Sequence, residues 1–276
     1  MNAAAIPAPI GRVKGSKASR VEDMLAVEEP LEIRLGGESL SVTMRTPGDD
    51  VELAAGFLFS EGIISDFSEI RSVGRPSDGC PNVVVIELAS SRPNAGMHAR
   101  RNFLMTSACG VCGKASLRDL KVNACPALPR DEIQLEPEII HGLPEWLRRE
   151  QSAFDTTGGL HAAARFNLGG ELESVREDVG RHNAVDKLIG HALLDHRTPL
   201  RSSLLLVSGR ASFELVQKAL MAGFPVLAAV VAPSSLAVAT AERSGMTLIG
   251  FLRNGRFNVY AGSNRIRGLG VMPQNV

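Results

Sequence analysis

The residues best suited to chemistry in this 276-residue chain are two cysteines, Cys109 and Cys112, in a Cys-x-x-Cys arrangement. A thiolate is the nucleophilic form of cysteine, and its pKa falls at a helix N-terminus or beside a basic side chain. Residues 115–120 are predicted to begin a helix, and Lys114 lies two residues after Cys112. Glycine follows each cysteine, which lets the backbone turn tightly and leaves the sulfurs uncrowded. The pattern favours thiols that carry or exchange sulfur.

Three other interpretations of the pair stay open. A zinc site would need two further ligands, although four-ligand structural sites usually come as two close pairs and only one close pair exists here. A thioredoxin-like redox centre places its Cys-x-x-C motif near a βαβ unit. Incidental spacing in a loop is the third. The candidates for further zinc ligands are His98 and two cysteines that precede proline and are predicted to lie in loops, Cys80 and Cys125.

A second group of residues, which are candidates for ligand binding, lies where predicted strands end. Polar and glycine-rich segments occur at residues 156–161, 176–183, 208–212 and 250–260. In open α/β sheets, ligands bind outside the carboxyl ends of the strands. Ser208-Gly209-Arg210 follows such a strand, and Ser212 is placed to cap the next helix. A helix N-terminus beside an arginine is a natural phosphate site.

The segment from Gly250 to Arg256 combines a tight turn with two guanidinium groups. Planar guanidinium groups suit a diphosphate and can stack on a base. The alternative is a plain β-turn with solvated arginines, because Asn254-Gly255 is a strong hairpin signal. His182 begins a predicted helix and is a candidate for capping, ligand binding or proton transfer.

The elements that must position these residues follow from hydrophobic periodicity. A β-hairpin is predicted at residues 31–44, a helix at 51–58, a strand at 83–86 and a helix at 138–150 that is interrupted near Pro144. In the second half strands and helices alternate, which indicates βαβ units and a mainly parallel sheet. The strands are predicted at 162–166, 173–179, 203–207, 226–231 and 247–252, and the helices at 183–194, 213–221 and 235–243.

Bulk composition narrows the class of protein. The net charge is zero and aromatic residues make up 4%, which argues against nucleic-acid binding. No apolar run approaches a membrane span, and the first twenty residues lack the apolar stretch of a secretory signal, so we expect a cytoplasmic protein. We predict a disordered basic tail at 1–20, a β-rich portion ending in the Cys-x-x-Cys loop at 21–125, and an α/β cofactor-binding domain at 126–276.

Together these segments resemble one family, the FdhD sulfurtransferase accessory proteins of formate dehydrogenase. The matching pieces run in family order over about 150 residues, and the longest and most specific of them contains Asp178, Arg181 and His182. The pieces are Thr106–Lys114, Thr157–His161, Arg176–Lys187, Ser208–Arg210 and Gly250-Phe251.

The resemblance implies a function and site residues. Such proteins accept persulfide sulfur from a cysteine desulfurase and pass it to the molybdenum or tungsten bis-(molybdopterin guanine dinucleotide) cofactor that formate dehydrogenase needs. Cys109 is then the persulfide carrier and Cys112 its partner. The guanine dinucleotide maps onto Phe251, Leu252, Arg253, Asn254, Gly255 and Arg256.

The resemblance also implies a fold and an assembly. It implies a cytidine-deaminase-like α/β/α sandwich without zinc ligands, and a homodimer. Arg210, His161 and His182 are weaker candidates for the same pocket. The alternatives are a cofactor-binding chaperone without sulfur chemistry and a zinc or redox Cys-x-x-Cys protein.

Overall fold

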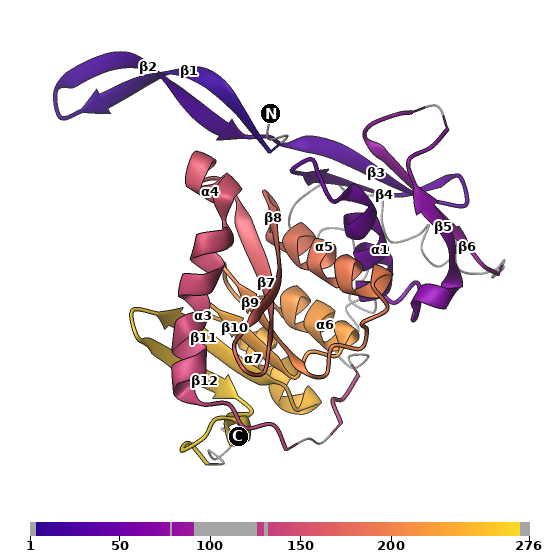
Figure 1. The fold of residues 1–276 in the computed structure, drawn as a ribbon, viewed down its shortest axis with the longest axis vertical. Coiled ribbons are helices and arrows are strands. Elements are labelled where there is room, and N and C mark those ends of the chain that lie inside the picture. The colour runs from indigo at the N-terminus through magenta and orange to yellow at the C-terminus, as the bar shows by residue number, and fades with distance from the viewer. Residues whose placement is uncertain (1–3, 78, 91–125, 130–131, 271–276) are drawn as a thin grey trace.

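The computed structural model describes residues 4–77, 79–90, 126–129 and 132–270. The predicted sulfur site, Cys109 and Cys112, lies outside these ranges, as do Cys125 and His98. The largest element is a six-stranded sheet with the strand order β12-β11-β10-β9-β7-β8 (Figure 1). Its strands are β7 (His161–Asn167), β8 (Leu172–Asp178), β9 (Ser203–Val207), β10 (Val226–Ala229), β11 (Thr247–Arg253) and β12 (Arg256–Ala261).

The sheet is parallel only at its centre, so the prediction of a mainly parallel sheet is wrong at both flanks. Strands β9, β10 and β11 run parallel, while β7 is antiparallel to both of its neighbours and β12 is antiparallel to β11. Parallel strands need a crossover of a dozen or more residues. The β7–β8 connection is only residues 168–171, and β11 turns directly into β12 through Asn254-Gly255. Such short links force antiparallel pairing.

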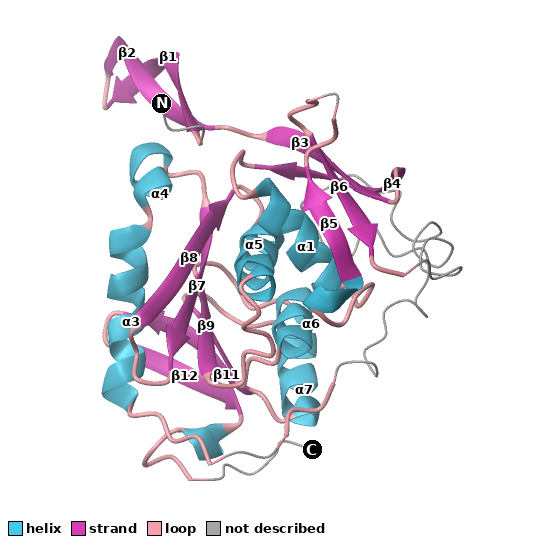
Figure 2. Ribbon diagram, turned by 45° about the vertical axis from the view of Figure 1, so that its right-hand side comes forward, coloured by secondary structure: helices cyan, strands magenta, loops and turns pink. Residues whose placement is uncertain are grey.

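Helices cover both faces of this sheet, as expected for an α/β/α sandwich. Figure 2 shows α3 (Pro137–Glu150) on one side and α5 (Arg181–Leu194), α6 (Phe213–Ala222) and α7 (Ser235–Ser244) on the other. Alternate residues of β9 face the two layers: Leu204 and Leu206 belong to the core under α3, and Leu205 and Val207 to the core under the other helices. The predicted α/β fold class is confirmed.

Helix α3 is continuous through Pro144, contrary to the predicted interruption. A proline inside a helix costs about 3 kcal/mol. Ile140, Leu143 and Leu147 lie on one face of this helix and are at most 2% exposed. Burying each of them contributes about 1.5–3 kcal/mol, which outweighs the cost of the proline.

The N-terminal portion forms a second sheet, with the strand order β4-β3-β6-β5. Helix α1 (Asp50–Ser60) lies between this sheet and α5, and one hydrophobic core runs through both portions. A Cβ atom on Gly56 would lie 1.8 Å from the carbonyl oxygen of Asp186, so α1 and α5 meet backbone to backbone. The other elements here are β3 (Glu29–Leu35), β4 (Glu38–Arg45), a 3-10 turn (Phe67–Glu69), β5 (Ile70–Gly74) and β6 (Val83–Leu88).

The expected disordered tail is instead a β-hairpin. Strands β1 (Ala5–Lys14) and β2 (Lys17–Ala26) pair along their whole length and project from the body as an arm (Figure 1). Its base contacts the short helix α4 (Ser152–Thr157). Gly15, with φ of 59°, opens the two-residue turn that such hairpins favour. A last 3-10 turn covers Ser263–Arg265. The helices that the structure describes are all too short or too polar to span a bilayer.

Candidate functional site

Several of the predicted polar segments meet at one edge of the large sheet, where β9, β10 and β11 end. Because β7 runs antiparallel to β9, its first residue, His161, also lies at this edge. The amide of Ala162 donates a hydrogen bond to the Ser208 hydroxyl at 2.9 Å. A Cβ atom on Gly209 would lie 3.5 Å from His161 Nδ1. The predicted segments around residues 161 and 208 are therefore direct neighbours.

Two helices begin at the same edge without side-chain caps. Helix α5 has Gly180 as its N-cap and α6 has Ser212, and neither residue provides a side-chain hydrogen bond to the helix. The Ser212 hydroxyl and Arg181 Nε are buried atoms that lack a hydrogen-bond partner in the described chain. Unpaired helix N–H groups and their dipole favour anions. This edge is equipped to hold a phosphate-bearing ligand.

The surroundings of His161 favour the neutral form of its imidazole. Burial lowers its pKa below 6.5, and the charge of Arg181 lowers it further, while Asp178 opposes the shift. A neutral imidazole offers one donor and one acceptor nitrogen. At neutral pH His161 therefore adds hydrogen-bonding capacity to this edge without adding charge.

Phe251 has an unusual backbone conformation at this edge. Its φ is 53°, and it lies in an irregular stretch where the pairing of β11 with β12 shifts register. Its amide donates to the carbonyl of Val231 at 3.2 Å. Next to it, a Cβ atom on Gly250 would lie 2.8 Å from the Pro233 side chain, so the backbone is tightly held. Strained conformations of this kind cost about 1–3 kcal/mol and cluster at functional sites.

The predicted dinucleotide segment Phe251–Arg256 divides into two parts. Leu252 is 1% exposed and packs in the core beneath α3, so its side chain is not available to a ligand. The following residues form the exposed β11–β12 turn, in which Asn254 and Gly255 have φ of 54° and 69°. This is the hairpin that Asn-Gly predicts. The guanidinium of Arg253 lies 5.9 Å from the centroid of the Phe251 ring.

Most of the long segment Arg176–Lys187 holds the two portions of the chain together. Asp178 is fully buried and pairs with Lys187 Nζ at 2.8 Å. It also accepts hydrogen bonds from the Asn183 amide group and from the backbone amides of Thr46 and Gly180. Lys187 Nζ donates to the Thr46 carbonyl at 2.9 Å. These contacts attach the end of β4 to β8 and α5.

The same segment contributes two further ion pairs at the boundary with α1. Arg176 binds the Glu52 carboxylate through two nitrogens, at 2.5 and 2.8 Å. Asp186 pairs with Lys218 at 2.9 Å and accepts the Ser60 hydroxyl at 2.7 Å. Sequence patterns do not distinguish such structural pairs from ligand-binding residues, because both need polar side chains at fixed spacing. Arg181, near His161, is the residue of this segment that supplies a buried, unpaired donor at the edge.

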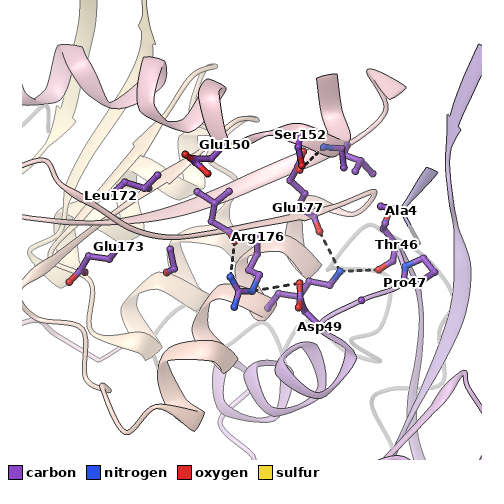
Figure 3. A pocket seen from close by; sticks show the side chains of 16 residues that line it. Ala4, Thr46, Pro47, Asp49, Glu150, Ser152, Leu172, Glu173, Arg176 and Glu177 are labelled. Carbon is purple, nitrogen blue, oxygen red and sulfur yellow. Dashed lines mark hydrogen bonds and ion pairs between the residues drawn. The ribbon is translucent and has the colours of Figure 1, made fainter. Parts of the chain in front are cut away.

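A cavity of about 660 Å³ lies between β8, the α3–α4 junction and the β4–α1 connection (Figure 3). Most of the charged side chains that line it already bind other groups of the protein. Arg176 is bound to Glu52, and Glu177 accepts the backbone amides of Ala153 and Phe154 at 3.0 and 2.9 Å. Burial raises the pKa of Glu177, and those two amide bonds oppose the shift. We therefore place the candidate ligand site at the sheet edge rather than in this cavity.

Within the ranges that the structure covers, no three His, Cys, Asp or Glu side chains are grouped as metal ligands. Of the cysteines considered as zinc ligands, only Cys80 is described, and it is exposed. The remaining candidates, Cys109, Cys112, Cys125 and His98, belong to residues outside the described ranges.

Taken together, the fold and the edge define an α/β/α protein with a site suited to a phosphate-bearing ligand. The chain belongs to the FdhD/NarQ family, whose model matches residues 26–267, and the resemblance noted in the sequence is thereby confirmed.

Three curated relatives and one solved structure support this membership. The sulfur carrier protein FdhD of Streptomyces avermitilis is 53% identical over 262 residues and covers 92% of this chain and 93% of its own. The proteins of the same name from Mycobacterium tuberculosis and Saccharolobus solfataricus are 49% and 43% identical; each alignment covers 92% of this chain, and 97% and 95% of the relative. A crystal structure from Desulfotalea psychrophila, described as a formate dehydrogenase accessory protein, matches with a TM-score of 0.75 at 26% identity and covers 95% of this chain and 99% of its own.

Proposed function

We propose that this protein is a cytoplasmic sulfur carrier that takes persulfide sulfur from a cysteine desulfurase. It delivers the sulfur to the molybdenum or tungsten bis-(molybdopterin guanine dinucleotide) cofactor, which is its substrate, for use by formate dehydrogenase. The names of the relatives support the carrier role. The structural observation that supports the substrate is the sheet edge, with two uncapped helix N-termini and the unpaired Arg181 Nε.

The sulfur chemistry is assigned to Cys109 and Cys112. The Cys109 thiolate attacks the terminal sulfur of the desulfurase persulfide, the donor's S–S bond breaks, and the desulfurase cysteine leaves as a thiolate. Cys109 then carries a persulfide. Attack by the Cys112 thiolate on the Cys109 sulfur forms a disulfide and releases the terminal sulfur as sulfide to the metal of the substrate. The two thiols supply both electrons, and an external thiol reduces the disulfide before the next cycle.

The guanine dinucleotide is assigned to the sheet edge and the adjoining β11–β12 turn. In this proposal the diphosphate faces the N-termini of α5 and α6 together with Arg181. Phe251 offers an aromatic surface for the base, and Arg253 and Arg256 contribute charge from the turn. Arg210, His161 and His182 are further candidates for this pocket. This arrangement uses helix dipoles and planar guanidinium groups, which suit phosphate oxygens.

The rival without sulfur chemistry is a chaperone that binds the cofactor and only ferries it. The two proposals differ in a cell that lacks its own carrier of this family and is supplied with variants of this chain. The sulfur-carrier proposal expects Cys109→Ala, and the double variant Cys109→Ala/Cys112→Ala, to abolish formate dehydrogenase activity. Cys80→Ala, which changes an exposed loop cysteine, is the matched control and should retain activity. Full activity in the double variant would favour the chaperone.

A further inference from the structure

The β1–β2 arm projects from the body and leaves much of its surface exposed (Figure 1). Among the strands that the structure describes, β1 and β2 pair only with each other. A two-stranded hairpin is marginally stable in water without further packing. The match to the family model begins at residue 26, so most of the arm lies before it. An exposed arm that the core does not need is a candidate for binding a partner.

The register of the hairpin divides the side chains of the arm between two faces. Residues directly opposite each other share a face, and successive residues along a strand alternate between the faces. Ala26 belongs to the face that is turned toward the body, because a Cβ atom on Gly159 would lie 3.2 Å from the Ala26 Cβ. The other face, which we call the outer face, is turned away from the body. It carries the pairs Ile6–Leu25, Ala8–Asp23, Ile10–Val21, Arg12–Ser19 and Lys14–Lys17.

The tip of the outer face carries positive charge that the fold does not neutralise. Lys14 lies directly opposite Lys17, and like charges in such a pair destabilise a sheet. Neither lysine forms an ion pair within the part of the chain that the structure describes. Arg12, the third basic residue of this face, is bound to Asp23 at 3.0 Å. The tip therefore offers two free ammonium groups to an acidic partner.

The base of the outer face is apolar. Ile6 and Leu25 lie directly opposite each other and are 52% and 47% exposed. Ile10 and Val21 form the next apolar pair toward the tip. Protein interfaces typically combine an apolar centre with a polar, charged rim. The outer face has this composition along its length.

The composition of the arm favours a protein partner over other anionic surfaces. Residues 5–26 include no Phe, Trp or Tyr. Single-stranded nucleic acid binds by stacking its bases on aromatic side chains, and segments that lie in a membrane interface use Trp or Phe as apolar anchors. An acidic protein surface with an apolar centre complements both the lysines and the apolar pairs.

The base of the arm lies close to the candidate ligand site. Helix α4 contacts both strands of the arm, and Figures 1 and 2 show the arm and α4 at the same end of the molecule. From α4 the chain passes through Gly158 and Gly159 to His161, which begins β7 at the ligand-binding edge of the sheet. A protein bound to the base of the arm is therefore beside the ligand at this edge.

We propose that the outer face of the arm docks the enzyme that receives the cofactor from the sheet edge. This inference rests on the proposed function, in which formate dehydrogenase is the receiver. The pairs Ile6–Leu25 and Ile10–Val21 form the apolar contact, and Lys14 and Lys17 attract an acidic surface of the enzyme. Complementary charges of this kind act mainly on the rate of association.

Reversal of one charge on either face tests the charged part of the interface. Binding of the full-length protein to cofactor-free formate dehydrogenase is measured by surface plasmon resonance at low salt. Lys17→Glu should raise the Kd about tenfold, mainly through slower association. Arg20→Glu is the matched control, because it reverses one charge on the same strand but on the face turned toward the body, and it should leave the Kd nearly unchanged. A wild type that does not bind, or equal weakening by both variants, would overturn the proposal.

A second pair of variants tests the apolar part. Leu25 and Val13 are both exposed and lie on opposite faces of the arm, since Val13 pairs with Ala18. Leu25→Ser should speed dissociation from formate dehydrogenase severalfold, because the loss of a packed apolar contact acts on the dissociation rate. Val13→Ser should leave the dissociation rate unchanged. Faster dissociation in Val13→Ser alone would contradict the assignment of the outer face.

Sulfur uptake and guanosine diphosphate (GDP) binding separate this inference from the proposed function. Lys17→Glu and Leu25→Ser lie outside the sheet edge, so both variants should take up sulfur at Cys109 and bind GDP as the wild type does. A wild type that takes up no sulfur contradicts the proposed function. Arm variants that bind formate dehydrogenase as tightly as a sulfur-loaded wild type contradict the docking inference alone. Loss of sulfur uptake with intact binding of formate dehydrogenase would assign the arm to the sulfur donor and overturn the inference.

Discussion

Alanine in place of Gly56 should force apart two helices that touch through their backbones. The new Cβ atom would lie 1.8 Å from the Asp186 carbonyl oxygen and 2.7 Å from the Gly190 nitrogen. Real Cβ atoms essentially never approach closer than 3.0 Å, so α1 and α5 must separate locally by about 1.2 Å. The obstructing atoms belong to the backbone, so no side-chain rotation relieves the clash.

The net effect combines two opposing terms. Overpacking of a tight core costs about 1–3 kcal/mol and occasionally more, and here the separated helices also carry the buried Leu53 and Leu188 away from their contacts. Alanine in a helix regains about 0.5–1 kcal/mol over glycine. We therefore expect Gly56→Ala to lower the free energy of unfolding by about 2 kcal/mol.

Urea unfolding followed by circular dichroism measures this difference. Gly142→Ala is the matched control, because Gly142 also lies inside a helix but a Cβ atom there would have nothing within 4 Å. It should gain stability by about 0.5–1 kcal/mol. If Gly56→Ala gained stability as the control does, the close approach of α1 and α5 would be refuted.

Four further predictions concern the site and its support. Arg181→Gln should weaken GDP binding at least tenfold in calorimetry, whereas the control Arg201→Gln, which lies just before β9 at the opposite edge of the sheet, should leave the affinity unchanged. Equal GDP affinities in the two variants would show that Arg181 does not contact the ligand. Phe251→Gly should relieve the positive φ and raise the unfolding free energy by about 1 kcal/mol while weakening GDP binding, and a loss of stability would show that its ring packing outweighs the strain. Lys187→Met leaves the Asp178 carboxylate buried without its partner and should lower the free energy of unfolding in urea by about 3–5 kcal/mol. The double variant Lys187→Met/Asp178→Asn should recover part of this loss, and no recovery would argue against the ion pair. Because folding lowers the pKa of His161, the unfolded chain binds a proton at this imidazole more readily than the folded chain as the pH falls through 6.5, and the free energy of unfolding should decline below that pH. His161→Asn should reduce this decline, and an unchanged pH profile in the variant would contradict the burial of the imidazole.

The elements with strong internal periodicity were predictable from the sequence. The helix after Pro47-Gly48, the β-branched strand at Val83 and the alternating strands and helices after residue 160 all occur close to their predicted positions. They were predictable because their apolar residues repeat with the period of the element that buries them. The hairpin arm was missed, since its basic, mostly exposed residues resemble a tail and its pairing depends on a partner strand rather than on a core.

The candidate site was predictable only in outline. The sequence indicated that residues near His161, Ser208 and Phe251 follow or begin strands, and the sheet brings them to one edge. The sequence did not indicate that Asp178 and Lys187 form a buried ion pair with each other. The position of this pair depends on contacts with Thr46, which lies more than a hundred residues away in the chain. The positive φ of Phe251 likewise has no signature in residue type.

The most direct test of the sulfur-carrier account is peptide mass spectrometry after incubation with a cysteine desulfurase and cysteine, on wild type and on Cys109→Ala. The account predicts one added sulfur atom that maps to Cys109 in the wild type and is absent from the variant. A wild type that gains no sulfur, or a Cys109→Ala protein that gains as much as wild type, would contradict it.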